Sequence, residues 1–179
     1  YKQTATWNAE AYYDAEAFIK PERASALHAD SWEITVKLGD VSLEAGDHVA
    51  VEITTSWTMD RGRPFCYGRV AVHEKWAPGY QGTPVCEFAD GIEYAIGVTA
   101  PEWMERYFII DVVITKGQLK PGDSFKVYLA NPEGSLIRCP WYAQEFPVNV
   151  AIRKTNDEFY QRIRQIPKVK VGAAKPRHW

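Results

Sequence analysis

The sequence lacks the features that would assign it a membrane, metal-binding or nucleotide-binding role. No apolar run approaches the roughly 20 residues that a membrane-spanning helix needs. The four histidines do not form an H-x-H or H-E-x-x-H motif, so no zinc or two-metal site is visible locally. His48 and His73 fall at strand positions opposite the apolar faces and are expected to be surface residues. A nucleophile elbow, a P-loop and a G-x-G-x-x-G loop are also absent from the sequence. We therefore expect no catalytic residue, no metal ligand and no cofactor in this chain.

The net charge is also small, and cysteines are few. The formal net charge is -2, which argues against a dedicated nucleic-acid-binding protein because such proteins normally carry a strongly basic surface. A modest basic cluster from Arg162 to Lys170 is either a solvated face or a site for an anionic ligand. The three cysteines, Cys66, Cys86 and Cys139, fit no zinc knuckle and allow at most one internal disulfide; buried free thiols are the simpler interpretation. No signal peptide is visible, but the chain begins at Tyr1, so both a cytoplasmic and an exported location stay open.

What the sequence does contain is a repeated two-residue alternation, typical of half-buried β-strands. It is clearest from Arg106 to Ala130, which reads as a strand, a Pro121-Gly122-Asp123 turn and a second strand, and so predicts a hairpin. The apolar faces of these two strands are predicted to consist of Phe108, Ile110, Val112 and Ile114, and of Phe125, Val127 and Leu129.

A similar pattern occurs earlier in the chain. Leu43 to Val51 has a leucine, a Gly46-Asp47 turn and an alternating strand, like Leu119 to Val127. The aspartates that follow glycine at turns, Asp40, Asp47 and Asp123, are expected to cap the backbone. Further strands are predicted at Ser31–Leu38, Cys66–His73, Ile92–Val98 and Phe146–Ile152, with Pro147 indicating an edge or a bulge. Many short strands bounded by turn residues favour an all-β fold, an antiparallel, immunoglobulin-like β-sandwich.

The domain organisation follows from where the alternation starts and stops. Residues 1–30 lack it and are expected to be an N-terminal arm, with Ala9–Lys20 forming either a short helix or an extended segment before Pro21. Residues 31–172 are expected to form the β-sandwich domain. Residues 173–179 are expected to be a linker or tail.

Aromatic residues supply the candidate binding site. Trp76 and Tyr80 lie in a long loop rich in proline and glycine, and Trp141 and Tyr142 lie in a second loop. Trp57 and Trp103 also fall outside the alternating core positions. Such rings either cover the ends of the sandwich as local cores, dock onto another domain, or stack on a ligand such as a sugar.

The order of these features resembles the N-terminal region of a bacterial family known as domain of unknown function 3604. The resemblance runs from Ser31 to Val171 and rests on five pieces: SWEITVKLGD with the Gly46-Asp47 strand, the loop Trp76 to Gln81, GQLKPGDSFKVYL, AQEFPVNVAIRK, and Pro167 to Val171. In that family a later domain is a PHP-like, metal-dependent hydrolase module, and its H-x-H motifs do not occur in this chain.

The resemblance implies a function without catalysis. This chain would be an accessory β-sandwich that packs against a catalytic domain, or another chain of the same protein, and shapes access to it through Trp76, Tyr80, Trp141 and Tyr142. No nucleic acid and no membrane are expected as partners. The alternative is a free-standing β-sandwich that binds a carbohydrate or another ligand, which predicts coplanar aromatic rings on an exposed face.

Overall fold

The computed structural model describes residues 8–54, 56–59, 84–99, 107–133 and 136–174, and these residues form strands and turns without a helix. The predicted all-β class is therefore confirmed. The strands are β1 (Asn8–Lys20), β2 (Arg23–Ser25), β3 (Ala29–Asp30), β4 (Glu33–Leu38), β5 (Leu43–Glu44), β6 (His48–Thr54), β7 (Thr58–Met59), β8 (Val85–Glu87), β9 (Glu93–Thr99), β10 (Tyr107–Lys116), β11 (Gln118–Leu119), β12 (Ser124–Tyr128), β13 (Ile137–Arg138), β14 (Gln144–Pro147), β15 (Asn149–Arg153), β16 (Gln161–Gln165) and β17 (Lys168–Gly172).

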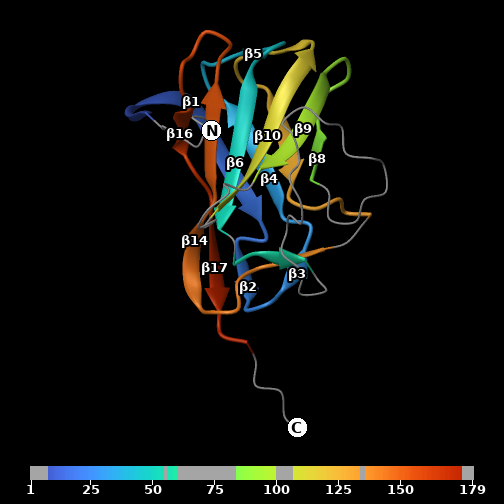
Figure 1. Ribbon diagram of the computed structural model, residues 1–179, viewed down its shortest axis with the longest axis vertical. Coiled ribbons are helices and arrows are strands. Elements are labelled where there is room, and N and C mark those ends of the chain that lie inside the picture. Colours follow the sequence, from blue (N-terminus) through green and yellow to red (C-terminus); the bar gives the residue numbers. More distant parts are fainter. Residues whose placement is uncertain (1–7, 55, 60–83, 100–106, 134–135, 175–179) are drawn as a thin grey trace.

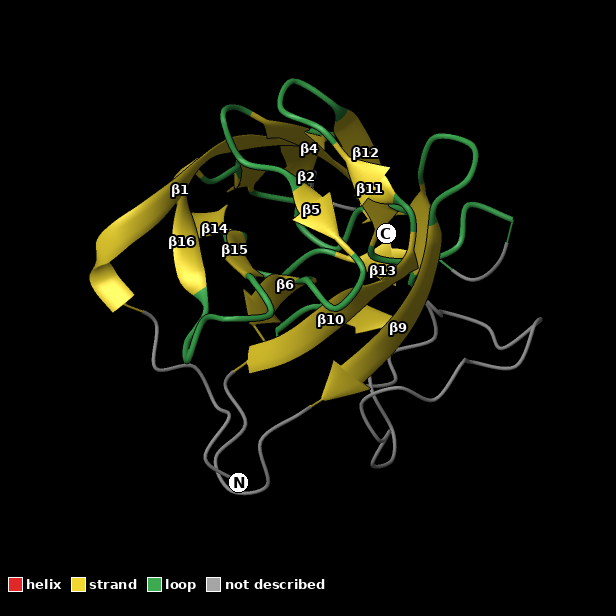
Figure 2. Ribbon diagram, turned by 90° about the horizontal axis from the view of Figure 1, so that it is seen from above, coloured by secondary structure: helices red, strands yellow, loops and turns green. Residues whose placement is uncertain are grey.

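A nine-stranded sheet makes up most of the molecule, with the strand order β8-β12-β4-β1-β16-β15-β6-β10-β9. The sheet bends at β1 and β16, so that β4 and β12 face β15, β6 and β10 across the core (Figure 1 and Figure 2). Neighbouring strands are antiparallel except at the bend, where β1 and β16 run parallel. The result is a β-sandwich whose two layers are continuous on one side.

The core forms where the alternating apolar faces of the two layers meet, as period-two side chains require. The predicted inward faces are confirmed for the described side chains, and burying each such residue contributes roughly 1.5–3 kcal/mol relative to leaving it exposed. They include Ile34, Val36 and Leu38 of β4, Val49, Val51 and Ile53 of β6, Ile110, Val112 and Ile114 of β10, Phe125 and Val127 of β12, and Val150 and Ile152 of β15.

The predicted hairpin between residues 106 and 130 is wrong. β10 pairs with β6 and β9, whereas β12 pairs with β4 and β8, so the two strands belong to opposite layers. The chain leaves β10 at Gly117, whose φ of 89° is a conformation that glycine adopts readily, and β11 then pairs with β5 rather than continuing into a hairpin. The segment therefore crosses from one wall of the sandwich to the other.

The helix alternative for Ala9–Lys20 is also wrong. These residues lie in β1, which pairs with β4 from Ala15 to Lys20 and with β16 between Asn8 and Glu16. Alternation was hidden here because alanine fills the inward positions, Ala15 and Ala17, while Tyr12 and Phe18 point to solvent.

A small three-stranded sheet, β14-β17-β2, closes one end of the sandwich. β14 is an edge strand, which confirms the interpretation of Pro147 because proline has no N–H to donate to a further strand. The chain leaves this sheet after Gly172, next to Ser25 and Gln144, the ends of the two neighbouring strands. No helix in the described part of the chain has the length and apolar character needed to cross a membrane.

Candidate functional site

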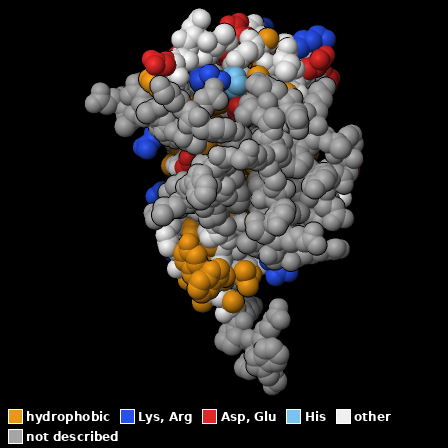
Figure 3. All heavy atoms as spheres, in the orientation of Figure 1, with side chains coloured by type: hydrophobic (Ala, Val, Ile, Leu, Met, Phe, Trp, Pro, Cys, Tyr) orange, Lys and Arg blue, Asp and Glu red, His pale blue; other side chains and the backbone are white. Residues whose placement is uncertain are grey.

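Three exposed apolar side chains lie at the end of the molecule that β14, β17 and β2 close. Trp141 is 71% exposed, Leu27 45% and Tyr142 36%. The two loops that carry them are joined by a hydrogen bond from the Leu27 amide to the Pro140 carbonyl, with an N···O distance of 3.4 Å. We call Leu27, Trp141 and Tyr142 the aromatic end; hydrophobic side chains gather on this end of the surface in Figure 3.

Local contacts fix the aromatic end in an outward orientation. Leu27 has a φ of 63°, an uncommon conformation for a residue with a branched side chain. The Cys139 amide donates to the His28 carbonyl at 2.9 Å, which anchors the second loop beside the first. Tyr142 packs edge-on against the buried Phe146, with ring centroids 5.1 Å apart. The backbone thus holds these apolar side chains in solvent, where a partner could cover them.

The ring geometry indicates apolar contact rather than sugar stacking. Trp141 and Tyr142 have centroids 5.4 Å apart and planes inclined at 77°, so they do not form one flat platform. Two inclined rings instead form an uneven apolar surface that can pack against another protein. Tryptophan and tyrosine are enriched in such protein–protein contacts.

The structure brings together two of the four predicted site residues, Trp141 and Tyr142. Trp76 and Tyr80 lie outside the described residues, as does Trp103. Trp57 is fully buried and packs edge-on against Trp32 at 4.8 Å, so for this tryptophan the local-core interpretation holds. Sequence reasoning missed Leu27, whose position in a turn gave no signal of its exposure.

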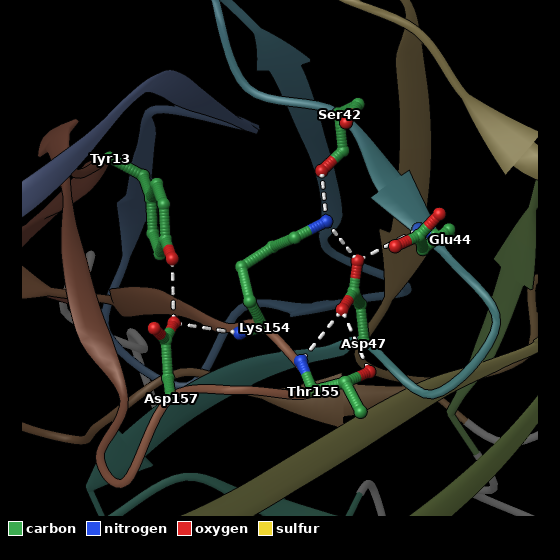
Figure 4. A network of polar contacts seen from close by, with 7 residues as sticks. All are labelled: Tyr13, Ser42, Glu44, Asp47, Lys154, Thr155 and Asp157. Atoms are coloured by element: carbon green, nitrogen blue, oxygen red, sulfur yellow. Dashed lines mark hydrogen bonds and ion pairs between the residues drawn. The ribbon is translucent and has the colours of Figure 1, made fainter.

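A polar network lies at the opposite end of the sandwich, around Asp47 (Figure 4). The Asp47 side chain is 0% exposed and forms an ion pair with the Lys154 ammonium, which also donates to the Ser42 carbonyl at 2.8 Å. The Glu44 amide donates to Oδ2 at 2.8 Å, and the Thr155 amide donates to Oδ1 at 2.9 Å. Burial alone would raise the pKa of Asp47, but these bonds from Lys154 and the two amides outweigh it and lower the pKa below its usual value.

Asp47 belongs to a turn that the chain uses three times. In each turn an aspartate accepts a hydrogen bond from the amide three residues before it: Asp47 from Glu44 at 2.8 Å, Asp123 from Lys120 at 2.7 Å, and Asp157 from Lys154 at 2.9 Å. The first two are the repeated Gly-Asp turns of the sequence, and their leucines pair through β5 and β11. The backbone-capping role predicted for Asp47 and Asp123 is confirmed, and the network is structural.

A second buried polar cluster lies on the face of β6 and β10 that points away from the core. His48 and Asp111 are 8% and 7% exposed, and His48 Nδ1 lies 3.1 Å from each Asp111 carboxylate oxygen. The Tyr160 hydroxyl donates to Asp111 Oδ1 at 3.0 Å, and burial together with that carboxylate raises the pKa of Tyr160. The expectation that His48 is a surface residue is wrong. The one indication of its burial in the sequence was Asp111, a single charged residue within a long apolar strand, whose carboxylate bonds to His48 in the fold.

The cluster could orient an imidazole, as acid-base sites do. Its groups bond to one another at low exposure, and no cluster of three or more histidine, cysteine or acidic residues suited to a metal ion occurs among the described residues. Cys86 and Cys139 are free thiols, and burial raises the pKa of both, which makes them poor nucleophiles.

No protein-family model matches this chain, and no curated protein matches it. Among solved structures it is similar to the second type II cohesin module from the adaptor ScaA scaffoldin of Acetivibrio cellulolyticus, with 6% identity over 93% of this chain and 94% of that one and a TM-score of 0.44. It is also similar to a family 3b carbohydrate-binding module from the biomass sensoring system of Clostridium clariflavum, with 8% identity over 93% and 99% of the two chains and a TM-score of 0.38. Likenesses this distant add nothing on function.

Proposed function

We propose that this chain is a non-catalytic β-sandwich module that docks onto another domain of the same protein through the aromatic end. The observation that carries the proposal is the place of this surface beside the point where the chain leaves the sandwich. The Ala26 amide donates to the Gly172 carbonyl at 2.8 Å, and Gln144 pairs with Val171. Any polypeptide that follows residue 174 would start next to Leu27, Trp141 and Tyr142.

The energetics favour docking over solvation. Covering apolar surface contributes about 25 cal/mol per Å², and truncating a well-packed interface tryptophan typically costs about 2 kcal/mol or more in binding. Trp141 is the most exposed of the large apolar side chains in the described part of the chain. It is therefore the residue we expect to dominate the contact.

The resemblance to the family with domain of unknown function 3604 suggests the identity of the partner. In that case the docked domain is a PHP-like, metal-dependent hydrolase module, which would carry its own metal ligands, and the aromatic end would shape access to it. Within the described residues, the buried carboxylates of the two polar clusters are engaged by side chains, Asp47 by Lys154 and Asp111 by His48 and Tyr160, which supports a role in binding rather than catalysis.

A binding measurement in trans tests the proposal. The polypeptide that, under this proposal, the same gene encodes after Trp179 is produced separately, and its affinity for this chain is measured by calorimetry. We expect Trp141→Ser to weaken binding by about thirtyfold or more, whereas Phe159→Ser, which removes another exposed ring, leaves it unchanged. A gene that ends at Trp179, or equal affinity of both variants, would contradict the accessory role.

The carbohydrate-binding alternative rests on the exposed Trp141 ring, since one tryptophan face can stack on a sugar. The inclined planes of Trp141 and Tyr142 do not meet its requirement for coplanar rings, at least for this pair. Calorimetry with soluble glycans distinguishes the two functions: saturable glycan binding that Trp141→Ala abolishes would replace docking as the function of this end.

A further inference from the structure

Four exposed basic residues alternate with buried ones along β16 and β17. These strands are separated by only two residues and follow one another down the length of the molecule (Figure 1). Because side chains alternate, Ile163, Pro167 and Val169 point into the protein while the basic residues between them are exposed. We call this set the basic ladder: Arg162, Arg164, Lys168 and Lys170.

The spacing of the basic ladder is set by the strand repeat. Residues two apart on one face of a strand are separated by about 6.6 Å. Arg162 and Arg164 of β16 form one such pair, and Lys168 and Lys170 of β17 form another. The full ladder spans about 26 Å at about 3.3 Å per residue. Arg23 extends its lower end, because it lies beside Lys170 in the register of β2 and β17.

Two of the basic residues form ion pairs: Arg164 with Asp14 at 2.6 Å, and Lys168 with Glu145 at 2.9 Å. Lys170 lies opposite Glu145 in the register of β14 and β17 and also interacts electrostatically with this carboxylate. Arg162 and Arg23 form no ion pair with a described residue. The least compensated positive charge therefore lies at Arg162 and at Arg23, at the two ends of the ladder.

We propose that the basic ladder binds an extended acidic peptide segment of a partner protein, with carboxylates at alternate positions. Such a peptide has the same two-residue repeat as the ladder, so its carboxylates can meet Arg162 at one end and Arg23 at the other. A nucleic acid fits less well, because its dense negative charge would meet Asp14 and Glu145 and because the chain carries a net charge of -2. This surface is separate from the aromatic end, and the proposal does not depend on docking there.

The test uses a fluorescently labelled peptide of about nine alternating glutamate and serine residues, long enough to span the ladder. Its affinity for the full chain is measured by fluorescence anisotropy at low salt. We expect Arg23→Gln/Arg162→Gln to weaken binding about tenfold and added salt to weaken it further, since exposed charge pairs are screened. The matched control is Lys37→Gln/Lys120→Gln, which removes two exposed lysines, one in β4 and one in the turn before β12, and should leave the affinity unchanged.

Length dependence sharpens the test. A peptide of about four residues reaches only one end of the ladder and should bind much more weakly. Absence of peptide binding, or equal losses in the ladder and control variants, would overturn the proposal. Tighter binding of heparin than of the peptide, lost in the ladder variant, would also overturn it and make the partner an acidic polysaccharide.

Discussion

At the scale of single residues, Asp47 and Asp123 occupy equivalent positions in two similar turns but have different surroundings. Both accept a hydrogen bond from an amide three residues before them. Only Asp47 is buried and forms an ion pair, with Lys154. The comparison of the two separates the contribution of the turn from that of the buried charge pair.

We expect Asp47→Asn to lower the free energy of unfolding by about 3 kcal/mol, because it leaves the Lys154 ammonium without its counter-ion and turns an amide donor towards other donors. Asp123→Asn should cost less than about 1 kcal/mol, since it removes only the capping of an exposed turn. Urea unfolding of both variants measures the difference. Equal losses would show that the ion pair adds nothing to the turn.

The same pair predicts a pH dependence. The pKa of Asp47 is lower in the folded protein than its usual value of about 3.9 in the unfolded chain, so the unfolded state binds more protons as the pH falls. Its stabilisation is complete above about pH 5 and is lost as the pH falls through the folded pKa. Unfolding free energies between about pH 5 and pH 2 should fall less steeply for Asp47→Asn than for the native chain.

Gly46 and Gly122 provide another comparison at equivalent positions. Their φ values are 97° and 88°, so alanine at either costs about 1 kcal/mol in backbone strain. At Gly122 an added Cβ meets open space, whereas at Gly46 it would lie 2.7 Å from the Thr155 hydroxyl, which bonds to Asp47. We expect Gly46→Ala to cost at least about 1 kcal/mol more than Gly122→Ala, and Thr155→Ala to remove part of that excess in the double variant.

Residue-level predictions from the sequence succeeded where a local rule was sufficient. Gly-Asp turns predict backbone capping, and the structure shows it at Asp47 and Asp123. The partner of Asp47 was not predictable, because Lys154 is distant in sequence and brought near by strand pairing. For the same reason His48 read as a surface residue, although it lies buried against Asp111.

At the scale of elements, one tyrosine joins the two ends of the nine-stranded sheet. Tyr94 of β9 accepts a hydrogen bond from the Cys86 amide of β8 at 3.1 Å and donates to the Cys86 carbonyl at 3.0 Å. The neighbouring Phe88 packs on Tyr94 and stacks on Phe125, with centroids 5.2 and 4.8 Å away. The Tyr94 hydroxyl thus satisfies the amide and the carbonyl of Cys86, as hydrogen bonds from a neighbouring β-strand would.

We expect Tyr94→Phe to lower the free energy of unfolding by about 1–2 kcal/mol, because both backbone groups of Cys86 lose their partner while the ring packing stays. Tyr128→Phe is the control, since its hydroxyl bonds only to the part-exposed Glu33 and Glu87 and should change stability little. Faster amide exchange at Cys86 in Tyr94→Phe alone would locate the effect. Equal stability of the two variants would contradict a closing role for Tyr94.

Alternation in the sequence predicted the strands but not their neighbours. The inward faces of β10 and β12 were identified correctly, yet the short turn between them suggested a hairpin. Alternation with a period of two shows which face of a strand is buried. Because both layers of a sandwich bury one face in the same core, alternation does not show to which layer a strand belongs. The crossing between layers depends on pairing of β11 with β5, which no local pattern encodes.

At the scale of the whole molecule, the β-sandwich class followed from the many short alternating strands, and the structure confirms it. The bend through which the sheet continues at β1 could not be predicted from the sequence, because alanine at the inward positions weakened the apolar–polar alternation there. The binding surface was predictable in part: Trp141 and Tyr142 were identified as loop aromatics, while Leu27 joins them only through folding.

Hydrogen–deuterium exchange tests the central claim, docking through the aromatic end, most directly. Exchange in this chain alone is compared with exchange in the full-length product of its gene, the longer polypeptide that the proposed function requires. We expect slower exchange in the longer polypeptide at residues 25–28 and 139–146, which carry Leu27, Trp141 and Tyr142, and unchanged exchange in the distant turn at residues 120–123. Equal exchange at the aromatic end in the two proteins would contradict the account.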